Sequence, residues 1–204
     1  MKGCRPFSDE EVKLIAKSFG GRYATRNKAL FILGVRSGFR ISEMLSLTVG
    51  DVFQHGKVVD HVTVARKQMK KKTEGRGVPL HPEARAAISV GLDVLARQLK
   101  VPQAKDLGPA CPVFCGRVRE GDGNRRAVAR ETAWRILEEA VGANELTGKI
   151  GTHRMRKTFA SRMYDTLGKD LVKVQHAMGH RNINSTVSYL SFREEDVVNA
   201  TLAA

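Results

Sequence analysis

The apolar residues near the start of the chain recur with the period of an α-helix. Residues 9–19 carry an apolar stripe that begins at Val12, and this spacing predicts an amphipathic helix. Ser8 stands directly before the stripe and Glu11 stands three positions later, which is the pattern of a capping box. Residues 27–35 are almost wholly apolar, so we expect a second helix that is buried on most of its faces.

The period of the pattern then changes. Val62 and Val64 alternate with polar residues, which predicts a strand with one buried face. The basic residues 66–72 follow, and residues 75–80 resume as a second strand whose end is marked by proline. We expect a small antiparallel hairpin with a strongly positive tip.

Helical spacing dominates the rest of the chain. Further helices are expected at residues 41–47, 84–99, 127–141, 153–167, 170–178, 183–189 and 194–201. Residues 101–124 are rich in Gly, Pro and charge, which is typical of a loop, and we expect Trp134 to pack in the core. With 204 residues, 42% of them hydrophobic, the chain can bury one substantial core. We therefore predict a single α+β domain over residues 1–204, mostly helical, with a small antiparallel β-sheet on one edge.

The charge of the chain points to a polyanionic partner. Lys and Arg number 35 against 21 Asp and Glu, which gives a formal charge of +14 and a pI near 10.1. Nucleic acid and an anionic membrane surface would both attract this charge. No apolar run approaches the roughly 18 residues of a membrane-spanning helix, and residues 1–10 lack the apolar core of a signal peptide. These patterns predict a soluble, cytoplasmic protein that binds nucleic acid and no membrane.

Metal binding is a weak interpretation of the Cys and His residues. Cys4, Cys111 and Cys115 are too few and too unevenly placed for a disulfide framework, and no second Cys/His pair lies at a zinc-ribbon spacing. His176 and His180 are four residues apart, but the Glu of a metalloprotease helix is missing between them. We expect reduced structural thiols, no metal site and no cofactor.

Three stretches carry residues suited to attack on a phosphodiester. Residues 38–43 read GFRISE, residues 153–156 read HRMR, and residues 178–180 read MGH, with Tyr189 after them. Such a reaction needs an in-line nucleophile, cations on the non-bridging oxygens and an acid for the leaving alkoxide. A tyrosine phenol has a pKa of about 10, so a nucleophilic tyrosine must be surrounded by cationic groups.

Each part of that chemistry has a candidate residue. Arg40 and Arg156 can clamp the phosphate, because a planar guanidinium holds two oxygens at once and stays charged. His153 lies three positions before Arg156, on the same helix face, and His180 can add a second imidazole. A lysine at the hairpin tip could protonate the leaving oxygen. Glu43 is read as a structural partner that orients Arg40 or a neighbour.

This ordered set resembles the catalytic domain of the tyrosine recombinase, or phage integrase, family over about residues 7–201. The resemblance implies a tyrosine recombinase-like fold and a DNA strand-transfer enzyme. In that reading Tyr189 forms a 3′-phosphotyrosyl bond without ATP or metal. It also implies a catalytic lysine shortly before the Val-Pro-Leu at residues 78–80. Lys72 is the first choice. Lys71 or Lys70 would take its position if the turn had a different length.

Double-stranded DNA is the partner that this resemblance implies, in the nucleoid if the protein is bacterial or phage-encoded. Basic residues are candidates to contact the DNA backbone: Lys70, Lys71, Arg76, Arg117, Arg119, Arg125, Arg126 and Arg130. Two other functions stay open at this point: a type IB topoisomerase-like nicking-closing enzyme and a noncatalytic DNA-binding module.

Two features of the family concern the ends of the chain. Family members usually carry an N-terminal core-binding domain, which we expect to be absent from this sequence because the resemblance begins near residue 7. The sequence is then either a fragment of a longer recombinase or a naturally minimal one. A helix within residues 190–204 carries an apolar stripe, and the resemblance implies that it is exchanged with a neighbouring protomer. Self-association on DNA, as a tetrameric synapse, is therefore expected.

Overall fold

The computed structural model describes residues 5–64, 76–117, 125–146, 151–190 and 201–202. The chain forms two compact units, Met1–Phe159 and Ala160–Ala204, and the boundary falls within one helix, α7 (His153–Thr166). Each unit is described by itself.

The first helix of the larger unit, α1 (Asp9–Ser18), begins where the sequence predicts. The side chain of Ser8 accepts a hydrogen bond from the backbone N–H of Glu11, and the Glu11 carboxylate accepts one from the backbone N–H of Ser8. These two bonds satisfy donors that the first helical turn leaves without intrahelical partners. The predicted capping box is confirmed.

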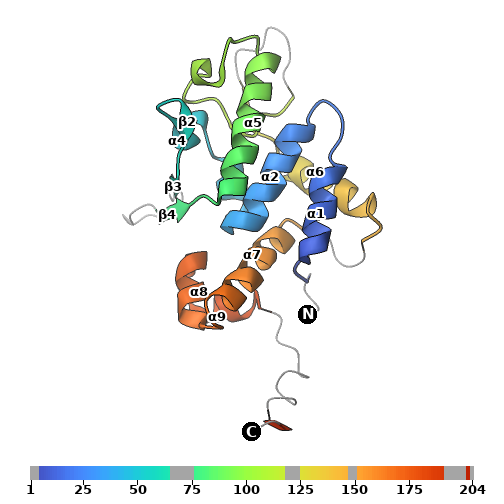
Figure 1. Ribbon diagram of the computed structural model, residues 1–204, viewed down its shortest axis with the longest axis vertical. Coiled ribbons are helices and arrows are strands. Elements are labelled where there is room, and N and C mark those ends of the chain that lie inside the picture. Colours follow the sequence, from blue (N-terminus) through green and yellow to red (C-terminus); the bar gives the residue numbers. More distant parts are fainter. Residues whose placement is uncertain (1–4, 65–75, 118–124, 147–150, 191–200, 203–204) are drawn as a thin grey trace. The chain divides into compact units, whose positions relative to one another are not determined.

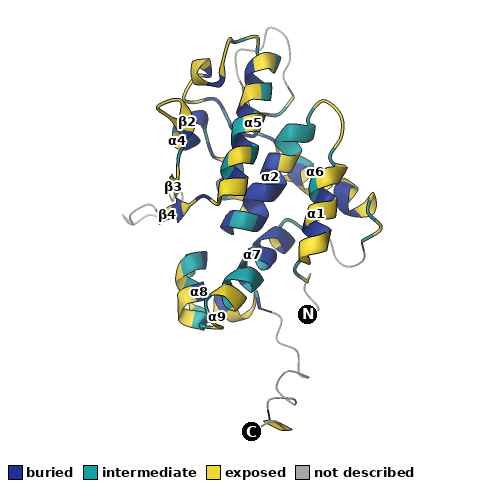
Figure 2. Ribbon diagram, in the orientation of Figure 1, coloured by how far each residue is buried: buried dark blue, intermediate teal, exposed yellow. Residues whose placement is uncertain are grey.

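Two long helices, α2 (Ala24–Ser37) and α5 (Pro82–Gln98), pack along each other in this unit (Figure 1). Residues 29–35 of α2 are all buried, and they form the dark blue stretch that follows the mainly teal first part of this helix (Figure 2). An amphipathic surface helix would have both buried and exposed positions within each turn. The prediction of a helix buried on most faces is therefore confirmed.

The predicted hairpin is present as β3 (His61–Val64) and β4 (Arg76–Pro79), which pair antiparallel with Val62 opposite Val78. Val62 is buried, as the alternation predicts, and Val78 opposite it is buried as well. A second, unpredicted hairpin joins β1 (Phe53–Gln54) to β2 (Lys57–Val58). Its two central residues both have positive φ, the conformation that a tight two-residue hairpin turn needs.

Three short helical elements and one longer helix lie in the larger unit together with the first part of α7. These are α3 (Ile41–Leu45), α4 (Val49–Val52), the 3₁₀ turn η1 (Ala104–Asp106) and α6 (Arg130–Gly142). α1 and α3 both contact α6. This arrangement places the start of α3 and the start of α7 in the same unit as α6.

Two predictions for the segment around α6 are wrong. The helix begins at Arg130 rather than at Ala127, because the preceding residues are extended and pair with residues 114–116. Val128 donates a backbone hydrogen bond to Phe114, at 2.8 Å, and Gly116 donates one to Arg126, also at 2.8 Å. Trp134 is 40% exposed rather than packed in the core, since the core face of the helix is formed by small and aliphatic residues.

The smaller unit consists of the second half of α7, α8 (Leu171–Met178) and α9 (Ile183–Val187), and α8 packs against α9. Asp170 caps α8 by accepting two backbone hydrogen bonds, and Gly179 ends it in the left-handed conformation. The helices expected in this region are confirmed up to residue 187. The helix expected at 194–201 lies almost entirely outside the described residues.

Among the described residues, no helix combines the length and apolar character needed to cross a membrane.

Gly38 ends α2 with φ of 62°, in the left-handed region that residues with a side chain rarely adopt. A Cβ atom at this position would overlap the ring of Phe159. Glycine is therefore required here for two independent reasons, backbone conformation and space.

We expect Gly38→Ala to lower the free energy of unfolding by about 2 kcal/mol or more, the sum of left-handed strain and overpacking. Gly142→Ala is the matched control, because Gly142 ends α6 with open space around it. Urea unfolding followed by circular dichroism measures both variants. Equal stability of the two would contradict this account of Gly38.

Candidate active site

Arg40 lies at the turn between α2 and α3. After Gly38 the chain buries Phe39 and then presents Arg40 as the residue that precedes the first turn of α3. The backbone N–H of Arg40 donates to Glu43 Oε2 at 2.7 Å, and its Nη1 lies 3.0 Å from Glu43 Oε1. The Arg40 side chain is still 45% exposed. Glu43 therefore orients an arginine whose guanidinium faces solvent.

Arg156 approaches the same turn from α7. Its side chain is buried, and its Nη1 donates a hydrogen bond to the backbone carbonyl of Gly38. A carbonyl is neutral, so this bond fixes the guanidinium without cancelling its charge. The bond joins α7 to the turn that carries Arg40.

His153 is the first residue of α7 and is exposed at its end. Neighbouring protein atoms displace part of its hydration, which is the main reason why its pKa lies below the ordinary 6.5. The positive charges of Arg130, Arg156, Arg40 and Lys157 lower this pKa further, in that order. Four cations thus act on one imidazole at the surface of the larger unit.

Arg130 and Lys157 change the sequence-based description of the site. Arg130 was predicted only as a contact to the DNA backbone, yet as the first residue of α6 it is the cation with the largest electrostatic effect on His153. Lys157 was not predicted as a site residue. Its place directly after Arg156 on a helix that begins with His153 is the signal that could have found it.

Arg154, between the two candidate catalytic residues, anchors α7 in the core. Its side chain is fully buried, its guanidinium carbon lies 4.1 Å from the centre of the Phe7 ring, and its Nη2 lies 3.5 Å from Glu11 Oε1. The backbone N–H of Phe7 also donates to Thr158 Oγ1 at 2.8 Å. The segment before α1 is therefore fastened to the same turns of α7 that carry His153 and Arg156.

The smaller unit holds the other two candidate catalytic residues. The rings of His180 and Tyr189 lie 5.2 Å apart, centre to centre. His180 Nδ1 lies 2.9 Å from Oγ1 of the buried Thr186, and Gln175 Nε2 donates to the His180 carbonyl at 3.1 Å. Thr186 and Gln175 were not predicted as site residues. Each lies within six positions of His180, but only the geometry of the helices shows that their side chains contact it.

The remaining candidates are distributed as follows. Lys70, Lys71 and Lys72 lie outside the described residues, as does the side chain of Arg76, whose backbone belongs to β4. Arg125 and Arg126 are exposed on the segment that leads into α6.

The structure thus brings Arg40, His153 and Arg156 together within the larger unit and His180 with Tyr189 within the smaller one. Cys111 and Cys115 are buried free thiols. No cluster of three or more His, Cys, Asp or Glu side chains suited to a metal ion occurs in the described part of the chain.

Comparison with known proteins decides the family. The sequence model of the phage integrase family matches residues 7–195. The chain belongs to the phage integrase family. It is 29% identical over 170 residues to the probable integrase/recombinase YoeC of Bacillus subtilis (strain 168), covering 83% of this chain and 80% of that protein. It is 31% identical to the tyrosine recombinase XerC of Syntrophus aciditrophicus (strain SB), covering 82% of this chain and 49% of that protein.

Solved structures of the same fold belong to the recombinases XerA and XerH. The XerA recombinase superposes with a TM-score of 0.69 at 18% identity, covering 97% of this chain and 62% of that one. XerH bound to a palindromic difH substrate in a post-cleavage complex gives 0.68 at 23% identity, covering 97% and 52%. The chain thus spans about half the length of the XerC and XerH proteins that it matches. These likenesses confirm the predicted tyrosine recombinase-like fold, mostly helical with small antiparallel strand pairs.

We expect the pKa of His153 in the folded protein to lie below 6.5 and to rise in Arg130→Ala, which removes a nearby positive charge. Titration of the imidazole Cε1–H signal by NMR measures both values, with Arg97→Ala on the exposed end of α5 as the control. Because the unfolded chain binds this proton more tightly than the folded chain does, His153 should also make folding less stable as pH falls below about 6.5. An unchanged pKa in Arg130→Ala would show that the two residues do not interact.

Proposed function

We propose that this protein is a site-specific DNA recombinase that cleaves and rejoins strands through a covalent phosphotyrosine. The observation that carries the proposal is the gathering of Arg40, Arg130 and Arg156 around His153 in a chain that also supplies the His180 and Tyr189 pair. Membership of the phage integrase family supports it.

The reaction exchanges one phosphoester bond for another. The Tyr189 hydroxyl gives its proton to the neighbouring His180, the proposed acceptor, and its oxygen attacks the phosphorus; the bond to the 5′-oxygen breaks and a 3′-phosphotyrosyl link forms. The departing 5′-oxygen takes a proton, for which Lys72 is the proposed donor. A 5′-hydroxyl from a partner strand then attacks the link and returns a proton to the lysine, while the released phenol oxygen takes back the proton held by the histidine. No external energy source is needed, because the energy of the broken bond is kept in the covalent link.

The cations have separate roles in this scheme. Arg40 and Arg156 hold the non-bridging oxygens and offset the extra negative charge of the pentacovalent transition state, where one well-placed donor is typically worth about 10²- to 10³-fold in rate. His153 is uncharged near neutral pH because its pKa is lowered, so it can donate one hydrogen bond to the phosphate or accept a proton. His180 supplies the second imidazole.

Double-stranded DNA is the proposed substrate, and self-association on it the proposed assembly. XerH is described with its difH substrate, and the Tn1549 transposon integrase in complex with circular intermediate DNA. We propose a tetrameric synapse in which residues 190–204 dock on a neighbouring protomer, as the apolar stripe of that segment suggests. A bacterial or phage origin would place this activity at the nucleoid.

Tyr189→Phe tests the nucleophile. The variant lacks the attacking oxygen, so it should form no covalent complex on a suicide duplex nicked beside the cleavage site, while its affinity for the same duplex stays within about twofold of the parent chain. Denaturing electrophoresis detects the complex and fluorescence anisotropy measures the affinity. Tyr164→Phe is the matched control and should still be trapped. Trapping of Tyr189→Phe at the parent level would remove Tyr189 from the reaction.

Thr186→Val tests whether Thr186 positions His180. The change removes the hydroxyl that contacts His180 Nδ1 and should slow cleavage about tenfold, the kinetic equivalent of one buried hydrogen bond. Thr186→Ser keeps the hydroxyl and should restore most of the rate. ¹⁵N chemical shifts of His180 report its tautomer directly. An unaltered tautomer together with an unaltered cleavage rate in the Val variant would show that the contact is incidental.

A further inference from the structure

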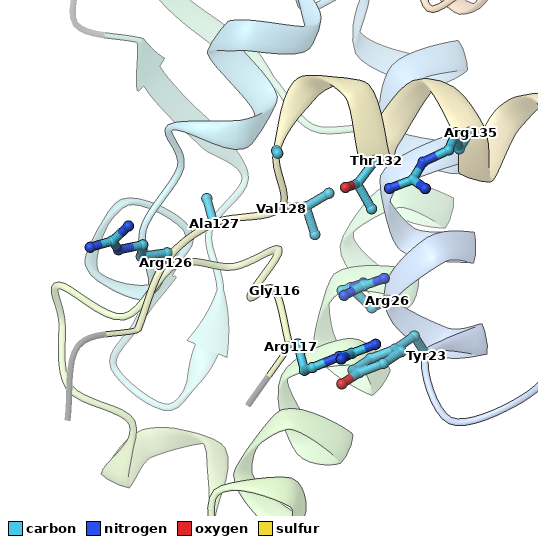
Figure 3. A pocket seen from close by; sticks show the side chains of 10 residues that line it. Tyr23, Arg26, Gly116, Arg117, Arg126, Ala127, Val128, Thr132 and Arg135 are labelled. Carbon is cyan, nitrogen blue, oxygen red and sulfur yellow. The ribbon is translucent and has the colours of Figure 1, made fainter. Parts of the chain in front are cut away.

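A cavity of about 630 Å³ opens in the larger unit beside the first turn of α2 (Figure 3). Tyr23 and Arg26 reach it from the start of α2, and Thr132 and Arg135 reach it from α6. The extended segments before and after residues 118–124 complete the wall. A cavity of this size is in the range of ligand-binding sites.

The side chains that line the cavity carry one sign of charge. Its charged residues are all arginines, and they are Arg26, Arg117, Arg126 and Arg135. Among the described residues, no Asp or Glu lines the cavity and none of these four arginines forms an ion pair with a carboxylate. Four like charges gathered in one concave surface repel one another, so an anionic group that enters would be strongly favoured.

Arg26 is held in a fixed position at the back of this cavity. Its Nε and Nη2 donate to Asn27 Oδ1 at 3.1 and 2.8 Å, its Nη1 donates to the Cys115 carbonyl at 2.9 Å, and its guanidinium lies 4.3 Å from the centre of the Tyr23 ring. Partial burial lowers its pKa, which means that the charge is poorly hydrated. A guanidinium with five N–H groups retains two beyond these three bonds.

Two helices, α6 and α2, connect the cavity to the candidate active site. Arg135 lies five residues along α6 from Arg130, about 7.5 Å, and Arg26 lies twelve residues along α2 from Gly38, about 18 Å. A strand of duplex DNA advances about 3.4 Å along the axis per phosphate. For a strand that runs along these helices, the two separations correspond to roughly two to five nucleotides.

We infer that this cavity binds phosphate groups of the DNA backbone two to five nucleotides from the reacting phosphate. The inference rests on the proposed function, because it places the reacting phosphate at His153. Several arginines spread over one cavity suit a ligand with several charges at fixed spacing, which a nucleic acid backbone supplies. The site would fix the register of the duplex on the catalytic residues, since phosphate contacts position a protein on DNA.

Ethylation of single phosphates tests the inference. Neutralising a contacted phosphate weakens binding, so the parent chain should show interference at one or more phosphates two to five nucleotides from the cleavage position. In the double variant Arg117→Ala/Arg135→Ala that interference should disappear, and the slope of log affinity against log salt should fall by about 1.8, for two lost contacts. Arg97→Ala, an exposed arginine outside the cavity, should keep both the interference and the slope.

The inference and the proposed function fail separately in this experiment. Covalent trapping through Tyr189 at saturating DNA should survive in the double variant, and loss of trapping in the parent chain would count against the proposed function alone. Interference that persists unchanged in a double variant with parental thermal stability would overturn the cavity as a phosphate site. Titration calorimetry with inorganic tripolyphosphate tests whether the cavity binds a free anion instead of DNA. Binding of tripolyphosphate that the double variant loses, with DNA interference unaffected, would assign the cavity to a free anion and overturn the inference.

Discussion

The hydrogen bond from Arg156 to the Gly38 carbonyl is the contact on which the arrangement of the candidate catalytic cations depends. It joins α7 to the turn that presents Arg40, and that turn exists because Gly38 adopts the left-handed conformation. The same close approach leaves no room for a Cβ beside Phe159. The Gly38 carbonyl therefore sets the distance between Arg40 and Arg156, which are more than a hundred positions apart in the sequence.

The second support of α7 lies on its other side. Arg154 is buried against Phe7 and near Glu11, so the helix cannot rotate without exposing a charge to the core or breaking an ion pair. Separating a buried charge from its partner is strongly destabilising. His153 and Arg156 lie on the side of α7 that carries the candidate site, whereas Arg154 lies on the side that packs toward α1. Three basic residues that are close in sequence therefore have different roles.

Local sequence signals predicted the parts of the fold that local forces decide. Ser8 and Glu11 are three residues apart and satisfy each other's backbone donors, and Val62 and Val64 alternate with polar residues, so α1 and the β3–β4 pair could be predicted. The delayed start of α6 could not, because it is decided by pairing between Val128 and Phe114. The burial of Arg154 depends in the same way on a segment about 150 residues away. The choice among Lys70, Lys71 and Lys72 depends on hairpin register, which spacing alone leaves open.

Partial burial and the positive charges around His153 disfavour protonation of its imidazole, because a charged imidazole loses hydration there and is repelled by like charges. In the smaller unit, His180 Nδ1 contacts Oγ1 of Thr186, and the His180 ring lies beside the ring of Tyr189. Tyr189, the proposed nucleophile, and His180 are therefore neighbours within one unit. An anionic phosphate is the group that both sets of residues are proposed to bind.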